Sequence, residues 1–140
     1  MGQFKNIKEV RYRGITFKSK LELTCYQAML SKKIECSYES ESFLLQEGFS
    51  FMGKKYRPIT YTPDFIARDA KGAKAIIECK GYVYRDFPLR KKMLLKKLSG
   101  EEEGCRYFLV QNEKDVLSLI DALLCINKKK TLKTYARKNV

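Results

Sequence analysis

The stretch Tyr61-Thr-Pro-Asp64-Phe-Ile, followed after a short interval by Ala75-Ile-Ile-Glu78-Cys-Lys80-Gly81, decides the expected fold. The first part begins a β-prone run that breaks at Asp69-Ala-Lys-Gly72, a cluster of turn-forming residues. The second part is another β-prone run that ends at the glycine. The two runs together predict a β-hairpin, whose register is left open by the length of the connection.

Three charged side chains are expected to meet at one end of this hairpin. Asp64 stands early in the first predicted strand, and Glu78 and Lys80 stand late in the second. These two ends lie at the same edge of an antiparallel pair, and residues two apart on a strand project from the same face. The alternative is a surface hairpin on which Glu78 and Lys80 form an ion pair of little energetic weight.

Two carboxylates placed in this way suit a divalent metal. Mg²⁺ takes carboxylate oxygens and keeps water molecules for a substrate phosphate, and the backbone carbonyl of Cys79 could supply a further ligand. Lys80 could orient or help to deprotonate an attacking water and stabilise charge on the phosphate. We therefore predict a metal site formed by Asp64, Glu78 and Cys79, with Lys80 as a catalytic residue.

The pattern Pro63-Asp64 … Glu78-Cys79-Lys80 resembles that of the PD-(D/E)XK nuclease superfamily. With the preceding run Gly53-Lys-Lys-Tyr56-Arg-Pro-Ile-Thr-Tyr61, the chain is similar to a family of small phage and prophage nuclease-like proteins, from Tyr12 to Leu98. The resemblance implies a restriction-endonuclease-like α/β core, a central mixed β-sheet flanked by helices. It also implies Mg²⁺-dependent DNA cleavage, with Mn²⁺ as a substitute, and kinship with the Holliday-junction resolvases of DNA recombination.

Residues 19–34 have the apolar spacing of a helix, through Leu21, Cys25 and Met29. Ser19 with Glu22 three residues later forms a capping box, so Glu22 has a structural interpretation. The resemblance gives it another, because resolvase-type nucleases carry an additional glutamate ligand on their first helix. We favour the second interpretation and count Glu22 among the catalytic and metal-binding residues.

The charge of the chain indicates a polyanionic partner. Its 29 Lys and Arg residues against 16 Asp and Glu residues give a formal net charge of +13. For a small domain this favours nucleic acid over a merely solubilising surface, with an anionic membrane as a weaker third option. The residues expected to contact the DNA backbone are Arg11, Arg13, Lys20, Arg90, Lys91 and Lys92. Arg90 stands where the resembled family has a lysine, and it keeps the positive charge.

Other features of the composition exclude whole classes of function. The chain has no histidine, which excludes imidazole general bases and Ser-His-Asp hydrolases. Its five cysteines include no Cys-x-x-Cys pair, so we expect reduced core residues and no zinc site. The sequence shows no apolar run of membrane-spanning length and no signal-peptide pattern, so we expect an intracellular, cytoplasmic protein without a membrane partner.

The length of 140 residues fits one domain. We expect a basic N-terminal arm over residues 1–18, a nuclease domain over 19–126 and a basic tail over 127–140. Before the hairpin we expect an extended link over 35–41, β-prone residues over 42–51, a turn over 52–55 and a strand over 56–61 with Pro58 at an edge or bulge. After the hairpin we expect a basic helix from Asp86, a buried central strand over 106–110 and a helix over 113–126. On the basic helix, Leu89, Met93 and Leu94 are expected to face the sheet.

The sequence thus leads to one main hypothesis and several alternatives. The main one is a Mg²⁺-dependent endodeoxyribonuclease that is structure-specific and resolvase-like. By analogy it is a homodimer, because two facing sites would cut paired strands of branched DNA. The alternatives are a restriction- or transposition-type enzyme that cuts DNA ends, a non-catalytic DNA-binding module, and a protein directed to RNA.

Overall fold

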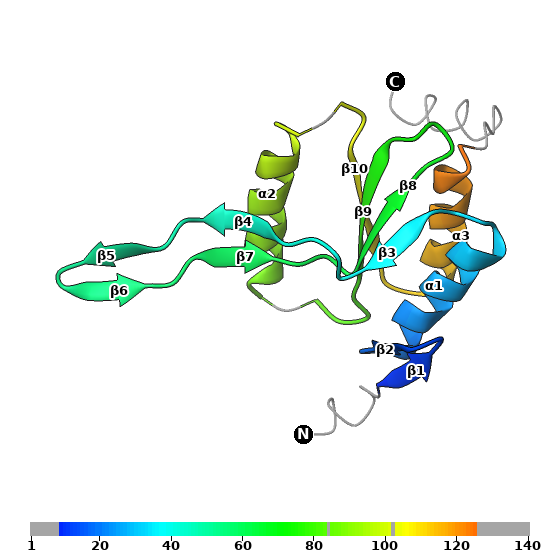
Figure 1. The fold of residues 1–140 in the computed structure, drawn as a ribbon, viewed down its shortest axis with the longest axis horizontal. Coiled ribbons are helices and arrows are strands. Elements are labelled where there is room, and N and C mark those ends of the chain that lie inside the picture. Colours follow the sequence, from blue (N-terminus) through cyan, green and yellow to red (C-terminus); the bar gives the residue numbers. More distant parts are fainter. Residues whose placement is uncertain (1–8, 84, 102, 126–140) are drawn as a thin grey trace.

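The protein is a mixed α/β structure in which helices cover both faces of a four-stranded sheet (Figure 1). The computed structural model describes residues 9–83, 85–101 and 103–125. The elements in these residues are β1 (Val10–Tyr12), β2 (Ile15–Phe17), α1 (Lys20–Ser31), β3 (Cys36–Tyr38), β4 (Phe43–Gln46), β5 (Phe49–Phe51), β6 (Lys54–Tyr56), β7 (Ile59–Tyr61), β8 (Phe65–Arg68), β9 (Lys74–Cys79), α2 (Phe87–Leu98), β10 (Arg106–Val110) and α3 (Glu113–Leu123).

The hairpin predicted from the opening stretch is confirmed as β8 and β9. The two strands are antiparallel, with Phe65 opposite Ile77 and Arg68 opposite Lys74. The connection closes as a turn because the carboxylate of Asp69 accepts hydrogen bonds from the backbone N–H groups of Lys71 (2.8 Å) and Ala73 (2.9 Å). Aspartate is a common turn residue for this reason, so the turn was readable from the sequence.

The strand order of the sheet is β10-β9-β8-β3, with β10 parallel to β9 and the other pairs antiparallel. Two predictions need correction. The segment expected as a link, residues 35–41, contains the strand β3, which pairs with β8. The strand β10, expected in the centre, lies at one end of the order within the described residues, and β9 takes the central place. All but the first residue of β9 are buried, whereas β10 is mostly half-buried.

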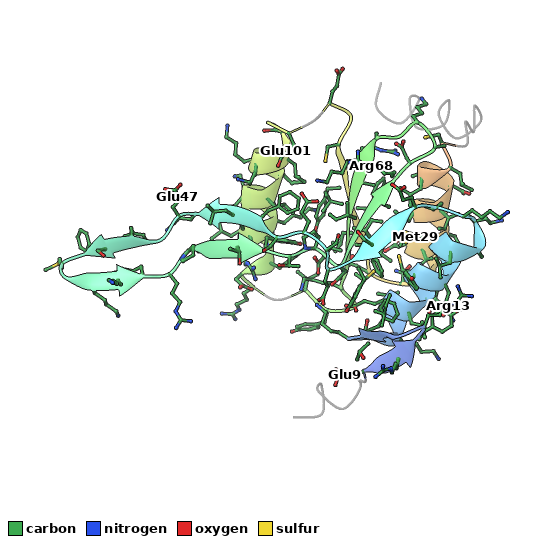
Figure 2. All side chains as sticks on the ribbon, viewed as in Figure 1. Glu9, Arg13, Met29, Glu47, Arg68 and Glu101 are labelled. Carbon is green, nitrogen blue, oxygen red and sulfur yellow. The ribbon has the colours of Figure 1, made fainter. Side chains whose placement is uncertain are left out.

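Alternation along β8 and β9 sends side chains into two separate cores. On one face, residues such as Phe65 and Ile77 pack with α1 and α3. On the other face, Ile66 and Ile76 pack with Leu94 of α2. Figure 2 shows both layers filled with side chains, including the labelled Met29 of α1 on the first face. Because both faces of the sheet are apolar, each face has to be covered by helices.

The bounds of α2 and α3 are close to those predicted, but some of their apolar side chains are exposed. Helix α2 begins after Asp86 with Pro88 in its first turn, as expected. Leu89 was expected to face the sheet, but it is exposed, whereas Leu94 and Phe87 are buried. Leu89 lies about 140° around the helix from Leu94, because the two are five residues apart at 3.6 residues per turn. In α3, the apolar side chain of Leu117 is likewise exposed.

Residues 43–61 form a narrow two-stranded ribbon that projects from the body of the protein (Figure 1). Strand β4 pairs with β7, and β5 pairs with β6. The predicted turn over 52–55 was too long, because Lys54 and Lys55 belong to β6. Met52 and Gly53 alone make the turn, both with positive φ (49° and 77°), as a two-residue hairpin turn requires.

The ribbon is interrupted midway, between its two paired segments. Pro58 lies there, between β6 and β7, so the single strand predicted over 56–61 is divided in two, since proline cannot donate to a strand ladder. Gly48 lies across from it, and a Cβ atom on Gly48 would come within 3.0 Å of the Tyr56 carbonyl oxygen and 3.2 Å of Pro58 Cδ. Glycine therefore permits this close approach of the two strands, since any other residue would require its neighbours to move by a few tenths of an ångström.

The N-terminal segment contributes the short hairpin of β1 and β2, with Arg13 and Gly14 at its turn (φ 51° and 81°). The predicted basic tail over 127–140, the start of the predicted N-terminal arm and the last residue of the predicted final helix lie outside the described residues. Within the described parts of the chain, none of the helices has the length and apolar character needed to cross a membrane.

Replacing Ser19 by Ala is expected to destabilise the protein by about 1 kcal/mol. Ser19 is the N-cap of α1, and its hydroxyl accepts a hydrogen bond from the backbone N–H of Glu22 at 3.2 Å. The measurement is the free energy of unfolding in urea. Ser50→Ala on the exposed ribbon is the control, and an equal effect of the two substitutions would contradict the role of the cap.

Candidate active site

Asp64 and Glu78 lie side by side at one end of the β8–β9 hairpin. Extending the register of Phe65 opposite Ile77 by one residue places Asp64 opposite Glu78. Both are buried, with 1% and 6% of their surface exposed. Asp64 is fixed by a hydrogen bond of 2.7 Å from the backbone N–H of Cys79 to its Oδ2 atom. The structure therefore brings the two predicted carboxylates together.

This proximity changes the ionisation of Glu78. Burial, followed by the charge of Asp64, raises the pKa of Glu78 from 4.5 to about 7, while Lys80 and a hydrogen bond from Tyr61 act in the opposite direction. The raised pKa makes the protonated form of Glu78 available to share a hydrogen bond with Asp64. Like charges directly opposite each other on neighbouring strands repel, and here they do so away from water.

Tyr61, at the end of β7, holds Glu78 in place from the ribbon side. Its hydroxyl donates to Glu78 Oε1 at 3.0 Å and lies 3.1 Å from the hydroxyl of Tyr107. Burial is the first cause that raises the pKa of Tyr61, so the hydroxyl stays protonated and can donate. Tyr61 was in the stretch that decided the fold, but nothing in the sequence assigned it to the site.

Lys80 projects from the same face as Glu78, as the spacing of two residues predicts. Its Nζ atom is 3.7 Å from Glu78 Oε2 and 5.1 Å from the centre of the Phe87 ring. About a quarter of the Lys80 side chain remains exposed. The ammonium group is thus held beside the carboxylate pair while it is still open to solvent.

Lys18, like Tyr61, is a site residue that sequence reasoning missed. Its Nζ atom lies 3.3 Å from Asp64 Oδ1 and 3.0 Å from Glu39 Oε2. Partial burial opposes the charge of Lys18, but the attraction of Asp64 and the other acidic neighbours outweighs it, so its pKa is raised. In the sequence Lys18 was one more basic residue of the N-terminal arm, 46 positions from Asp64, and no local pattern connects the two.

Glu22 takes part in the cap of α1 through its backbone and in a separate set of hydrogen bonds through its side chain, whose role as a metal ligand stays a prediction. Its backbone N–H completes the cap of Ser19, but its Oε1 atom accepts from the backbone N–H of Lys18 (2.9 Å) and the hydroxyl of Tyr38 (2.7 Å). The side chain is buried, and burial together with the charge of Asp64 raises its pKa. Glu22 therefore belongs to the same electrostatic cluster as the carboxylates of the hairpin.

A cavity of about 340 Å³ opens onto these residues. It is lined by Lys18, Tyr61, Thr62, Glu78, Lys80, Asp86, Phe87 and Arg90. Three cationic side chains from three separate segments therefore share one cavity with Glu78. Such an arrangement of positive charge around buried carboxylates suits an anionic ligand.

Arg90, predicted as a contact to the DNA backbone, is half-buried and lines the cavity. Its Nη2 atom donates to the carbonyl oxygen of Thr60 at 2.7 Å, and its guanidinium lies 5.5 Å from the centre of the Tyr61 ring. Its Nε atom is buried and has no hydrogen-bond partner among the described residues. A buried donor of this kind costs free energy unless a ligand or a water satisfies it.

The other predicted DNA contacts lie apart from the lining of the cavity. Arg11 and Arg13 are exposed on the β1–β2 hairpin, and Lys20 is exposed in the first turn of α1. On α2, Lys92 is exposed, whereas Lys91 is half-buried with its Nζ atom 5.3 Å from the centre of the Tyr107 ring.

The donor set fits Mg²⁺ but not an all-protein metal cage. Within residues 9–83, 85–101 and 103–125, no group of three or more His, Cys, Asp or Glu residues is arranged to hold a metal ion. Asp64 and Glu78 form a close pair, and one or two carboxylates completed by waters and substrate phosphates are the usual protein ligands of Mg²⁺. Glu22 as a third ligand remains a prediction.

A comparison with known families gives a match that covers most of the chain. The model of the family described as "Protein of unknown function (DUF1064)" matches residues 3–116, a range that includes every residue of the cavity lining. No curated protein and no solved structure matches the chain.

Proposed function

The chain belongs to the DUF1064 family, whose description gives no function, and we propose from its site that it is a Mg²⁺-dependent endodeoxyribonuclease. The observation that carries this proposal is the buried pair of Asp64 and Glu78 beside a cavity that gathers Lys18, Lys80 and Arg90. Carboxylates for a metal and cations for a phosphate are the two requirements of metal-assisted phosphodiester hydrolysis.

We further propose that the core is of the restriction-endonuclease-like, PD-(D/E)XK type. Support comes from the placement of Pro63-Asp64 directly before β8 and of Glu78-Cys-Lys80 at the end of β9, two neighbouring antiparallel strands, with a third strand parallel to β9. Helices on both faces of a mixed sheet agree with that core.

In this proposal Asp64 and Glu78 would hold the metal, with the backbone carbonyl of Cys79 as a further ligand. A Mg²⁺ ion bound there would supply Lewis-acid polarisation of the phosphate and lower the pKa of a bound water. Glu78 must be ionised to bind the metal, and its pKa of about 7 means that it gives up its proton near neutral pH.

The cationic residues of the cavity would bind and orient the DNA. Lys80, beside Glu78, is placed to orient the attacking water and to stabilise charge that develops on the phosphate. Arg90 would donate its unpartnered Nε hydrogen to a phosphate oxygen. Lys18 neutralises Asp64 in the free protein and would release it to the metal.

The substrate that we propose is branched DNA, cut by a homodimer whose two sites make paired nicks. The formal charge of +13 supports a nucleic-acid ligand.

Incubation of the protein with a labelled four-way junction and with a linear duplex of the same arm sequence, in Mg²⁺ or in EDTA, tests this proposal. We expect paired nicks near the junction in Mg²⁺ and none in EDTA. Lys80→Ala is expected to remove cleavage and retain binding.

The other outcomes separate the alternatives. Cleavage of the duplex alone would keep the nuclease and reject the branched substrate. Tight binding of both DNAs without cleavage in Mg²⁺ or Mn²⁺ would reject the enzyme and favour a DNA-binding module. Cleavage that persists in Lys80→Ala would place the active site elsewhere.

A further inference from the structure

The outer part of the ribbon, residues 49–56, is rich in aromatic and basic residues, and both of its strands are exposed along their whole length. We call this segment the distal arm. Its strands β5 and β6 pair with each other, and every residue in them is exposed (Figure 1). Figure 2 shows the side chains of these strands extending away from the body, beyond the labelled Glu47. An isolated two-stranded hairpin gains little stability of its own, so a partner is expected to cover it in use.

One face of the distal arm is aromatic. The register places Phe49 opposite Tyr56 and Phe51 opposite Lys54, so these four side chains share a face, while Ser50 lies on the other. The rings of Phe49 and Tyr56 are stacked, with centroids 4.9 Å apart and an interplanar angle of 11°.

The exposure of this apolar surface is large for residues of this type. Phe51 is 62% exposed, and Met52 at the tip is 90% exposed. Exposed apolar residues gathered in one patch, with charged residues beside them, mark an interaction surface.

Positive charge accompanies the aromatic face. Residues 43–61 contain three basic residues, Lys54, Lys55 and Arg57, and a single acidic residue, Glu47. The Nζ atom of Lys54 sits 5.3 Å from the centre of the Tyr56 ring. A second copy of this chain, with a formal charge of +13, would bring like charge against the arm, whereas a polyanion is attracted to it.

The arm is continuous with the candidate active site. Strand β7 ends at Tyr61, whose hydroxyl donates to Glu78. Met52 at the tip is nine residues before Tyr61, which corresponds to about 30 Å along the ribbon at about 3.3 Å per residue. This reach is close to one turn of duplex DNA, about 34 Å.

We propose that the distal arm is a second DNA-binding site that stacks Phe49, Phe51 and Tyr56 on unpaired bases, with Lys54 and Lys55 on the flanking phosphates. Flat aromatic rings beside cations are the usual means of binding unpaired bases, because every base has a face on which a ring can stack. The inference rests on the proposed function for DNA as the ligand, but it does not depend on cleavage. It assigns the preference for branched DNA to the arm, since base pairs at a branch point can expose a face, whereas base pairs within a continuous duplex are stacked on both sides.

The absence of tryptophan from the chain gives a direct test. Phe51→Trp, made in the full-length protein, places a single tryptophan on the aromatic face. In EDTA, which prevents cleavage, we expect its emission to be quenched by a twenty-nucleotide oligo-dT and much less by a blunt-ended, fully paired linear duplex. Binding of both DNAs is followed independently by the anisotropy of a label on the DNA.

Affinity measurements complete the test. Phe51→Ala and Tyr56→Ala are each expected to weaken oligo-dT binding at least about fivefold, as stacking on one base implies. Ser50→Ala, on the opposite face of the same arm, is the matched control and is expected to bind as the unchanged protein does.

Several results would overturn the proposal. Anisotropy that reports saturation while the tryptophan emission stays constant would show that the DNA is bound elsewhere, with the proposed nuclease function untouched. Emission that depends on protein concentration without DNA would assign the arm to a second copy. A response to vesicles of anionic lipid and not to oligo-dT would assign it to a membrane surface. If the protein does not cleave DNA in Mg²⁺ but the tryptophan emission still responds to oligo-dT, the nuclease function is rejected and the DNA-binding role of the arm is supported.

Discussion

Asp64→Asn is expected to reduce Mg²⁺-dependent DNA cleavage by about 10³-fold or more while leaving the protein folded. The carboxylate is one of two that would hold the metal, whose contribution to the transition state is several kcal/mol, and about 1.4 kcal/mol corresponds to a tenfold change in rate. Asn has nearly the same shape, and its side-chain oxygen can still accept the bond from the Cys79 N–H. The measurement is the single-turnover rate on a labelled junction at saturating protein.

Asp69→Asn is the matched control for this experiment. Asp69 is the acidic residue at the opposite end of the same hairpin, where its Oδ2 atom pairs with Arg106 Nη2 at 2.9 Å. Its loss weakens a turn and an ion pair, so we expect lower stability but an unchanged cleavage rate at a temperature where the variant is folded. Equal rates for Asp64→Asn and the unchanged protein would refute the proposed metal site.

Glu78→Gln is expected to stabilise the metal-free protein at pH 8 by up to about 3 kcal/mol. The pKa of Glu78 is raised from 4.5 to about 7 by burial and by Asp64, so the folded state favours the protonated form. The stability that protonation provides is fully present below pH 4.5 and is lost as the pH rises through 7. A shift of about 2.5 pKa units corresponds to about 3 kcal/mol. Glutamine keeps the neutral form at every pH and still accepts from Tyr61.

Urea unfolding in EDTA at pH 4.5 and at pH 8 measures this effect. The difference between the two proteins is expected to be small at pH 4.5 and large at pH 8. Glu47→Gln on the ribbon is the control, because that carboxylate is exposed. Mg²⁺ is expected to stabilise the unchanged protein more than Glu78→Gln, since binding the metal requires the ionised carboxylate. A difference that does not vary with pH would contradict the proposed coupling of Glu78 to Asp64.

Repulsion between buried carboxylates destabilises the candidate site in the metal-free protein. Asp64, Glu78 and Glu22 are all buried, and Lys18 and Lys80 offset only part of their repulsion. Such sites are stabilised by what they bind, which is a common feature of catalytic centres.

The sequence by itself determined the features that depend on neighbouring residues. The turn at Asp69 and the alternation of the two flanking runs are local, so the β8–β9 hairpin and the meeting of Asp64, Glu78 and Lys80 at its end were predictable. The same holds for the cap at Ser19 and for the start of α2 at Asp86.

The tertiary structure decided which distant segments complete the site. Lys18, Tyr61 and Arg90 reach the cavity because β2, β7 and α2 pack where they do, and no periodicity in the sequence encodes those placements. The same reason explains why β3 joins the sheet, why β10 lies at one end of it, and why the distal arm projects alone. Local patterns set the conformation of each segment, whereas the burial of apolar faces on both sides of the sheet set which segments became neighbours.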